Sequence, residues 1–338
     1  MRVHLTRAAT FSPFCRFLEA GEIDVSRRLT SIGISPDLLE DPEQLVPLRP
    51  CCRFVNHVKG HEGIEDLGIV VGSQNSLVDF GLFGLVMRQS LTLKDLIEKF
   101  IQWLPLVDSG VRAWMEPAGT PDAVRICLNH DIDLARALIN EYALIVLIDG
   151  IRMAAGPEWR PTTVWMDRQD PGSLQRRFEA LSEATIHRES DWAGILLPTH
   201  LLGLPIRRDR QERNAGGEVT NQLASTAPPE DLVGSIIFAI RHGLVDHALS
   251  LDEIADLTGT SGRTIQRTLF SLGTSYRELL DRVRFEEATT LLRDSRHHIT
   301  EIAYHLGYTE PANFTHAFRR WTGHSPATYR RQALQVAS

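Results

Sequence analysis

Residues 297–331, HHITEIAYHLGYTEPANFTHAFRRWTGHSPATYRR, predict two helices joined by a tight turn. Ile302 and Leu306 are spaced like apolar residues on one face of a helix. Gly307 is expected to end this helix, because glycine adopts a positive φ at low cost. Pro311 is tolerated in the first turn of the next helix. The pattern is typical of a helix-turn-helix, whose second helix enters the major groove of DNA.

A second copy of this pattern lies upstream, at residues 251–270. The matched pairs are Ala255 with Ala303, Gly259 with Gly307, and Ile265 with Phe314, with one extra residue in the turn of the later copy. The alanine of the first pair indicates that the two helices of each copy cross closely. An internal repeat is more informative than one match, since many helical hairpins share a small residue and a glycine.

The stretch between the two copies, residues 275–295, predicts one amphipathic helix of about 20 residues. At 1.5 Å per residue such a helix is roughly 30 Å long. One turn of B-DNA is about 34 Å. The sequence therefore predicts that this helix holds the two recognition helices in successive major grooves on one face of the DNA.

Further residues in the last third of the chain match the sequence motif of a known protein family. They are residues 261–267, 273–275, Arg284, 302–303, 307–308, 313–314, 317–318, Gly323, 325–326 and 329–330. Through them, residues 229–338 resemble the DNA-binding domain of the AraC/XylS family of bacterial transcription regulators. The resemblance implies a sequence-specific regulator whose partners are promoter double-stranded DNA and RNA polymerase.

Residues 65–207 resemble the ligand-binding domain that accompanies one branch of this family. That resemblance implies that the domain binds a small-molecule effector and that the protein could form a homodimer. It does not identify the residues that would bind the effector. The expected architecture is an α+β domain over 1–206, a polar linker over 207–228, and an all-α domain over 229–338 with two helix-turn-helix units on a long helix. A constitutive DNA-binding regulator, whose first domain only oligomerises, is the alternative.

The charge of the chain is distributed unevenly. The net charge is −7, but residues 229–338 hold 12 Arg, no Lys and 13 Asp or Glu, so this region is close to neutral. Attraction to DNA must then come from local clusters of Arg rather than from a broad basic surface. The sequence therefore predicts weak non-specific binding and a strong dependence on base and shape readout.

Ile265 and Phe314 are expected to point inward, which fixes the outward faces of the two recognition helices. The residues expected to contact DNA are Arg263, Thr264, Gln266, Arg267, Ala312, Asn313, His316, Arg319 and Arg320. Arg can hold guanine, and Gln adenine, through two hydrogen bonds. His316 replaces the Arg of many family members and is shorter, so the second helix is expected to discriminate less. Arg319 and Arg320 are expected to contact phosphates.

The first part of the chain predicts mixed elements. Helices are expected within 1–46, with breaks at Gly21 and Gly33, and at 48–58, 93–106, 134–155 and 171–181. Strands are expected at 111–115 and 123–128 as a hairpin, and at 162–166 and 193–198. The glycines of 63–84 lack the spacing of a phosphate-binding loop, which favours a role in packing and turns.

Two candidate sites in this part have simpler explanations. Trp103, Trp114, Trp165 and Phe178 could line an effector pocket, although aromatic residues at such spacings are more often core. His57 and His61 could form half of a metal site on a helix, although a solvated polar face is the simpler interpretation.

No catalytic motif is present, so we expect no enzymatic activity, no cofactor and no bound metal. The four cysteines, Cys15, Cys51, Cys52 and Cys127, show no metal-ligand spacing and indicate reduced thiols. With a polar N-terminal stretch and no long apolar segment, the sequence favours a cytoplasmic protein without a signal peptide or membrane span.

Overall fold

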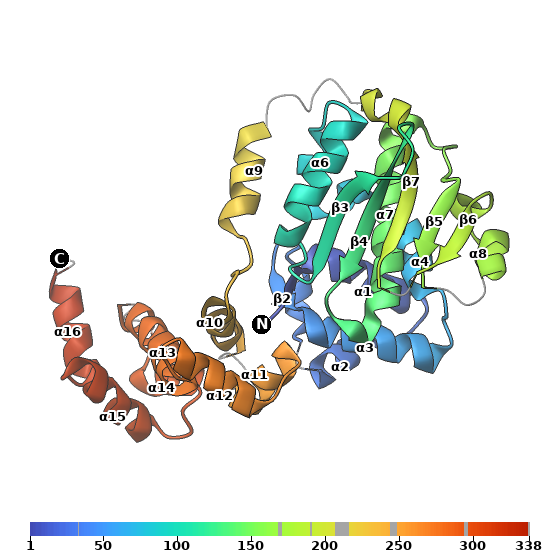
Figure 1. Ribbon diagram of the computed structural model, residues 1–338. Coiled ribbons are helices and arrows are strands. Elements are labelled where there is room, and N and C mark those ends of the chain that lie inside the picture. Colours follow the sequence, from blue (N-terminus) through green and yellow to red (C-terminus); the bar gives the residue numbers. More distant parts are fainter. Residues whose placement is uncertain are drawn as a thin grey trace. The chain divides into compact units, whose positions relative to one another are not determined.

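The computed structural model describes residues 1–32, 34–167, 171–189, 191–206, 216–243, 249–293 and 297–336 (Figure 1). The chain forms two compact units. One is His4–Pro228, and the other combines Met1–Val3 with Pro229–Ser338. The break expected at Gly33 lies outside the described residues.

The first unit is built on a mixed sheet of order β3-β4-β7-β5-β6 (Figure 1). Its strands are β3 Val111–Pro117, β4 Ala123–His130, β5 Thr163–Met166, β6 Thr185–Arg188 and β7 Ala193–Pro198. Neighbouring strands are antiparallel except β5 and β6, which are parallel. The expected hairpin is confirmed as β3 and β4, which pair from Val111 with His130 to Pro117 with Val124. A separate two-stranded sheet joins β1 Leu5–Arg7 to β2 Leu45–Pro47.

Helices cover one face of the large sheet. The central helix α7, Arg136–Ala155, packs on β4, β7 and β5, and α6, Leu93–Trp103, packs on β3 (Figure 1). The side chains of α7 are apolar on nearly all sides of the helix, which is the pattern of a buried helix. The other helices of this unit are α1 Ala8–Ala20, α2 Val25–Ser31, α3 Leu48–Glu62, α4 Leu67–Ser73, α5 Gly81–Arg88, α8 Pro171–Arg177 and α9 Gly216–Ser225.

Two glycines of the 63–84 stretch let α4 pack closely on α7. A Cβ added to Gly68 would lie 2.2 Å from the carbonyl oxygen of Leu138. A Cβ added to Gly72 would lie 3.0 Å from the Cβ of Ile145. At these two positions the glycines serve helix packing, as the missing phosphate-loop spacing suggested.

Several elements differ from the sequence expectation. The strands β1, β2 and β6 were not expected, because each is only three or four residues long and carries little periodicity. The helix expected over 171–181 is broken into α8 and a short 3-10 turn, Glu179–Leu181.

Part of the expected linker is a packed element of the first unit. Within 207–228, residues 216–225 form α9, which packs on α5. Leu223 of α9 is fully buried in the core of this unit. Apolar burial therefore fixes this segment, although its polar composition suggested a free linker. Residues 207–215 lie outside the described residues.

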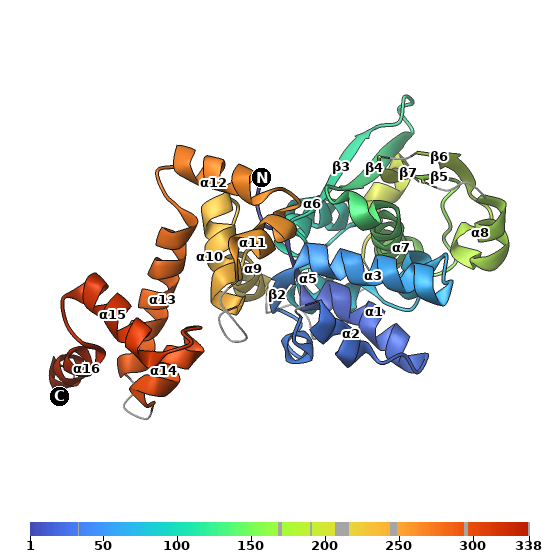
Figure 2. The same ribbon diagram turned by 90° about the horizontal axis from the view of Figure 1, so that it is seen from below.

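The second unit is entirely helical in its described residues. Its helices are α10 Leu232–Gly243, α11 Leu251–Thr258, α12 Gly262–Ser271, α13 Tyr276–Arg293, α14 Ile299–His305, α15 Pro311–Thr322 and α16 Pro326–Val336. The helix pairs α11–α12 and α14–α15 lie toward opposite ends of the long helix α13 (Figure 2). Val3 is also part of this unit and donates its amide hydrogen to Ser235 Oγ at 3.0 Å.

Candidate nucleic-acid interface

The first helix pair is defined by its caps. Ser250 and Glu253 form a capping box at the start of α11. Gly259 ends α11 with a φ of 69°, in the left-handed region that favours glycine. Ser261 then caps α12, because its hydroxyl accepts the amide hydrogen of Thr264 at 3.3 Å. These caps set both ends of the turn that positions α12.

The outward face of α12 carries the cations that the sequence predicted. Ile265 and Leu269 are fully buried, so they fix the inward face. The residues on the other side, Arg263, Gln266 and Arg267, are exposed. Their side chains make no hydrogen bond or ion pair with another described residue, so their donors are available to a ligand.

Thr264 differs from these neighbours. It is half-buried, and its hydroxyl shares a hydrogen bond with Ser261 Oγ at 3.0 Å. The side chain therefore takes part in the cap that starts α12.

The second helix pair repeats this arrangement. Gly307 follows α14 with a φ of 73°, and Pro311 is the first residue of α15. Phe314 and Phe318 are fully buried against α14 and the closing helix. Gly323 ends α15 with a φ of 76°. The expected repeat is therefore present in the backbone as well as in the sequence.

The outward face of α15 is less basic than that of α12. Ala312, Asn313, His316 and Arg319 are exposed and form no hydrogen bond or ion pair with another described residue. Only Arg319 among them carries a permanent positive charge, and it lies in the last turn. The first helix therefore presents two guanidinium groups in its first two turns, whereas the second presents one near its end.

Arg320, the remaining predicted contact, is already engaged. Its Nη2 lies 2.8 Å from Asp281 Oδ2 on α13. Because half of the Arg320 side chain is exposed, this ion pair is worth about 1 kcal/mol or less. Its main role in the free protein is to join α15 to the connecting helix.

Other arginines of this unit also hold helices together. Arg284 donates Nε–H to the carbonyl oxygen of Leu306 at 3.0 Å and stacks on Tyr308, with its guanidinium carbon 4.4 Å from the ring centre. Arg330 on α16 donates to the carbonyl oxygen of His297 at 2.7 Å. Arg284, Arg320 and Arg330 therefore hold helices together, whereas Arg263, Arg267 and Arg319 have no partner among the described residues.

Sequence reasoning missed one residue on this surface, Phe270. It is 84% exposed, which is unusual for phenylalanine. In the repeat Phe270 corresponds to Arg319, and it lies one helical turn beyond Arg267 on the same outward face. The burial of Leu269 was the available signal, because the next residue of a helix with this inward face must point outward.

The connecting helix is slightly shorter than expected. α13 has 18 residues, which corresponds to about 27 Å at 1.5 Å per residue. This length is close to the roughly 34 Å of one turn of B-DNA.

The residues singled out in the first unit do not gather into one site. Trp114 and Trp165 lie on the sheet face opposite α7 with Trp192, which crosses the space above Gly194. Trp103 packs partly buried against the core. Phe178 borders a separate polar pocket near the C-terminal half of α7.

His57 and His61 share one face of α3, with ring centres 5.8 Å apart. The nearby carboxylate of Glu62 is held by Arg28 at 2.9 Å and by His61 at 3.0 Å. In the part of the chain that the structure describes, no three His, Cys, Asp or Glu residues are grouped as a metal site would require. The same part contains no helix that is both long and apolar enough to cross a membrane.

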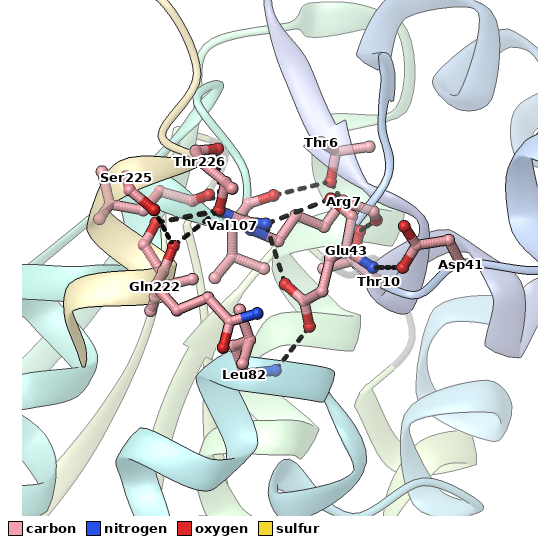
Figure 3. Close-up of polar contacts among 12 residues, drawn as sticks. Thr6, Arg7, Thr10, Asp41, Glu43, Leu82, Val107, Gln222, Ser225 and Thr226 are labelled. Carbon is pink, nitrogen blue, oxygen red and sulfur yellow. Dashed lines mark hydrogen bonds and ion pairs between the residues drawn. The ribbon is translucent and has the colours of Figure 1, made fainter. Parts of the chain in front are cut away.

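A buried arginine anchors α9 within the first unit (Figure 3). Arg7 is 1% exposed and pairs with Glu43 at 2.9 Å. Its other donors reach the carbonyl oxygens of Leu223 and Thr226 at 3.2 and 3.1 Å and that of Leu106 at 3.0 Å. The end of α9, which leads to the second unit along the chain, is thus held by one charged side chain.

Two helix pairs on a long helix, each with a basic or polar outward face, define a DNA-binding protein of the helix-turn-helix class. Residues 244–332 match a family model described as a helix-turn-helix domain. Residues 23–206 match the model for the arabinose-binding domain of AraC transcription regulator, N-terminal. The chain belongs to the AraC family of transcription regulators.

The chain is also similar to named proteins. The ornithine utilization regulator of Pseudomonas aeruginosa is 23% identical over 314 residues, which cover 91% of this chain and 92% of the relative. The transcriptional regulator VirS of Mycobacterium tuberculosis is 29% identical over 182 residues, 53% of each chain. The crystal structure of the regulator CdpR from Pseudomonas aeruginosa aligns with 90% of this chain and 96% of its own at 23% identity and a TM-score of 0.41.

Proposed function

We propose that this regulator reads a promoter through α12 and α15, placed in successive major grooves on one face of the DNA. The observation that carries the proposal is that both helices turn exposed, unpaired polar or charged side chains away from buried apolar faces. The length of α13 supports the spacing, and the turns fixed by Gly259 and Gly307 support the repeated geometry.

We infer that α12 contributes most of the sequence discrimination. Arg263 and Arg267 are unpaired, and a bidentate contact of Arg with guanine discriminates by about 1–3 kcal/mol. On α15 the equivalent positions are Ala312 and His316, which offer fewer donors. Arg319 is placed to contact a phosphate, and Arg320 must leave Asp281 before it can do the same.

We infer that Phe270 adds an apolar contact to the reading surface of α12. The ring lies beside two unpaired arginines and is exposed to water in the free protein, so it gains little hydrophobic free energy there. In a major groove the ring can bury the methyl group of a thymine. Through this contact, α12 would prefer an A·T base pair at one position of the operator.

We propose that a small molecule bound by the first unit changes the DNA affinity of the second. The match to the arabinose-binding domain model supports a ligand-binding origin for the first unit. The anchoring of α9 by Arg7 supplies a contact that a ligand could strengthen or weaken. In the alternative, the first unit only oligomerises, and DNA binding is constitutive. Under either proposal, we infer that the regulator bound at its promoter acts on RNA polymerase.

Mapping of binding sites across the genome of the source bacterium, followed by footprinting of the strongest site, tests the proposal. We expect two protected major-groove segments about one helical turn apart. Protection of a single segment would contradict reading by both helices.

The same footprint with residues 229–338 alone separates two explanations of a negative result. Binding by the fragment but not by the full chain would mean that the first unit restrains the second and that an effector is missing. Absence of binding by a folded fragment would contradict the proposed interface.

A further inference from the structure

The first unit contains an apolar crevice that no family match assigns. A cavity of about 40 Å³ lies between α1, α3 and α7, and a neighbouring one of about 50 Å³ lies between α5, α6 and α7. They share four lining residues: Thr10, Asp108, Ile139 and Tyr142. Because these side chains form the wall between the cavities, small movements of them join the two into one space.

The lining of this crevice is mostly aromatic and aliphatic. On α7 it follows one helical stripe, Ile139, Tyr142, Ala143 and Val146. Ile139 and Ala143 are half-buried, so they mark the side from which the crevice opens. Phenylalanines from α1, α5, α6 and the segment before α5 complete it: Phe11, Phe14, Phe80, Phe83 and Phe100.

One polar group in the crevice lacks a partner. Tyr142 is 6% exposed, and its hydroxyl forms no hydrogen bond among the described residues. Leaving such a group unpaired costs about 1–3 kcal/mol, and a ligand that pairs with it recovers that cost. Among the described residues that line the crevice, this hydroxyl is the buried side-chain group left unpaired, so it favours a polar atom of a ligand.

The charged residue of the lining restricts the ligand further. The described residues that line the two cavities include Asp108 but no Lys or Arg, and burial raises the pKa of the Asp108 carboxyl group. A ligand carboxylate or phosphate would meet an acidic group and no cation here. Sugars and amino acids would leave most of their polar groups unpaired against phenylalanine rings.

A second, more polar pocket is a weaker candidate. It has a volume of about 240 Å³ and is bordered by charged residues of α7 and of the segment 177–180. Those charges already have partners: Asp149 accepts from Ser76 at 2.8 Å, and Arg152 donates to the carbonyl oxygen of Trp159 at 2.9 Å. Arg177 also pairs with Asp66. Among the described residues that border this pocket, no buried side-chain donor or acceptor is left without a partner.

We propose that the crevice, which α7 forms with α1, α3, α5 and α6, is the effector site, and that its ligand is a small, uncharged, mainly apolar molecule with one hydroxyl or carbonyl group that pairs with Tyr142. This inference rests on the effector control proposed above and names its site. An apolar protein cavity that binds benzene has a volume of about 150 Å³, so binding of a similar ring must join and widen the two cavities.

Three residues that line the crevice, Thr6, Thr10 and Val107, also belong to the hydrogen-bonded group around Arg7 (Figure 3). These contacts give a bound ligand a route to α9. Thr10, in the shared wall, has its hydroxyl 2.6 Å from that of Thr6. The carbonyl oxygen of Val107, which also lines the crevice, accepts the amide hydrogen of Arg7 at 2.8 Å. A ligand that displaces Thr10 or Val107 therefore acts directly on the residue that anchors α9.

The test uses two matched pairs of probes with the full-length protein: p-cresol with toluene, and cyclohexanol with cyclohexane. Each pair differs by one hydroxyl group. We expect the hydroxylated probes to raise the melting temperature saturably and more than their partners, whereas L-arabinose and L-ornithine leave it unchanged. In Tyr142→Phe the advantage of the hydroxylated probes should disappear, while the apolar probes bind as before.

A second variant tests the location. Ala143→Leu fills the crevice and should abolish binding of all four probes, whereas Ala137→Leu, on α7 but outside the lining, should preserve it. Failure of both hydroxylated probes to bind, or an equal advantage in Tyr142→Phe, would overturn the assignment. If Ala143→Leu does not fold, the comparison of the two probe pairs in Tyr142→Phe still decides.

DNA affinity, measured separately by titration of the footprinted operator, distinguishes the two proposals. Binding that depends on Tyr142 but leaves DNA affinity unchanged would support the site and contradict effector control. A change of DNA affinity caused by L-ornithine or L-arabinose, without binding of the apolar probes, would support effector control and overturn this site.

Discussion

At the scale of single residues, pairing decides what each arginine of the DNA-binding unit does. Arg284, Arg320 and Arg330 use their donors within the protein, whereas Arg263 and Arg267 have no partner among the described residues. An unpaired guanidinium keeps its hydrogen-bonding geometry for a base edge or a phosphate. The distinction cannot be seen in composition, which makes this unit nearly neutral.

Arg267→Ala should weaken binding to the operator by about 1–3 kcal/mol and relax the preference at one base pair. Arg267→Lys keeps the charge but loses the two-pronged geometry, so it serves as the matched control. If Arg267 reads a base, both variants relax the preference in a binding assay on operators randomised at each position. Retention of full affinity and preference by the lysine variant would instead indicate a phosphate contact.

Phe270→Ala should weaken binding by about 0.8 kcal/mol, roughly fourfold, if its ring buries one thymine methyl group. Replacing each thymine of the operator in turn by uracil removes only that methyl. We expect one such replacement to weaken binding by the wild-type protein and to have no effect on Phe270→Ala. Equal effects of every replacement on both proteins would show that Phe270 does not contact a thymine methyl.

At the scale of elements, small residues set how closely helices approach. Ala255 and Ala303 are both buried where the two helices of each pair cross, and Gly68 and Gly72 do the same for α4 on α7. Protein interiors are close-packed, so an added side chain at such a crossing forces the helices apart.

Ala303→Leu should lower the free energy of unfolding of the DNA-binding unit by about 1–3 kcal/mol through overpacking. It should also reduce protection of the operator half that α15 contacts more than that of the other half. Ala327→Leu is the control, because Ala327 is exposed on α16. Denaturant unfolding and footprinting of both variants give the comparison, and equal stability of the two variants would refute close packing at Ala303.

Arg7→Lys should loosen α9 without unfolding the first unit. Lysine keeps the charge opposite Glu43 but cannot reach the carbonyl oxygens of Leu223 and Thr226 at the same time. We expect faster amide hydrogen exchange over 216–226, with Arg16→Lys as the exposed control on α1. Unchanged exchange in this segment would mean that the apolar contacts of Leu223 alone hold α9.

At the scale of the whole molecule, the chain has two compact units, and all four cysteines lie in the first. Burial raises the pKa of Cys15 and Cys127 to about 12, and it raises the pKa of Cys51 and Cys52 as well. The rate at which the thiols are labelled therefore reports the opening of the unit His4–Pro228. We expect this rate not to depend on the DNA-binding helices.

At pH 8 the native thiols should react with a disulfide reagent very slowly, because the reactive form is the thiolate and these groups stay protonated. Unfolding returns the pKa to its ordinary value near 8.5, so labelling should follow the opening of the first unit. Ala303→Leu should leave the labelling rate unchanged. Rapid labelling of the native protein, or faster labelling in Ala303→Leu, would contradict two independently folded units.

The sequence alone determined the elements that depend on local periodicity and on special backbone conformations. Gly259, Gly307 and the repeated apolar spacing predicted both helix pairs, because a left-handed cap and a buried stripe are encoded within a few residues. The hairpin of β3 and β4 and the long buried helix α7 followed from the same kind of pattern.

The tertiary structure alone decided what depends on residues far apart in the chain. Arg7 and Thr226 meet across 219 positions, and such long-range contacts, together with the burial of Leu223, show that α9 belongs to the first unit. Likewise, the unpaired hydroxyl of Tyr142 and the ion pair of Arg320 are set by which neighbours the fold supplies. Periodicity gives the inward and outward faces of a helix, whereas packing decides which polar groups find partners.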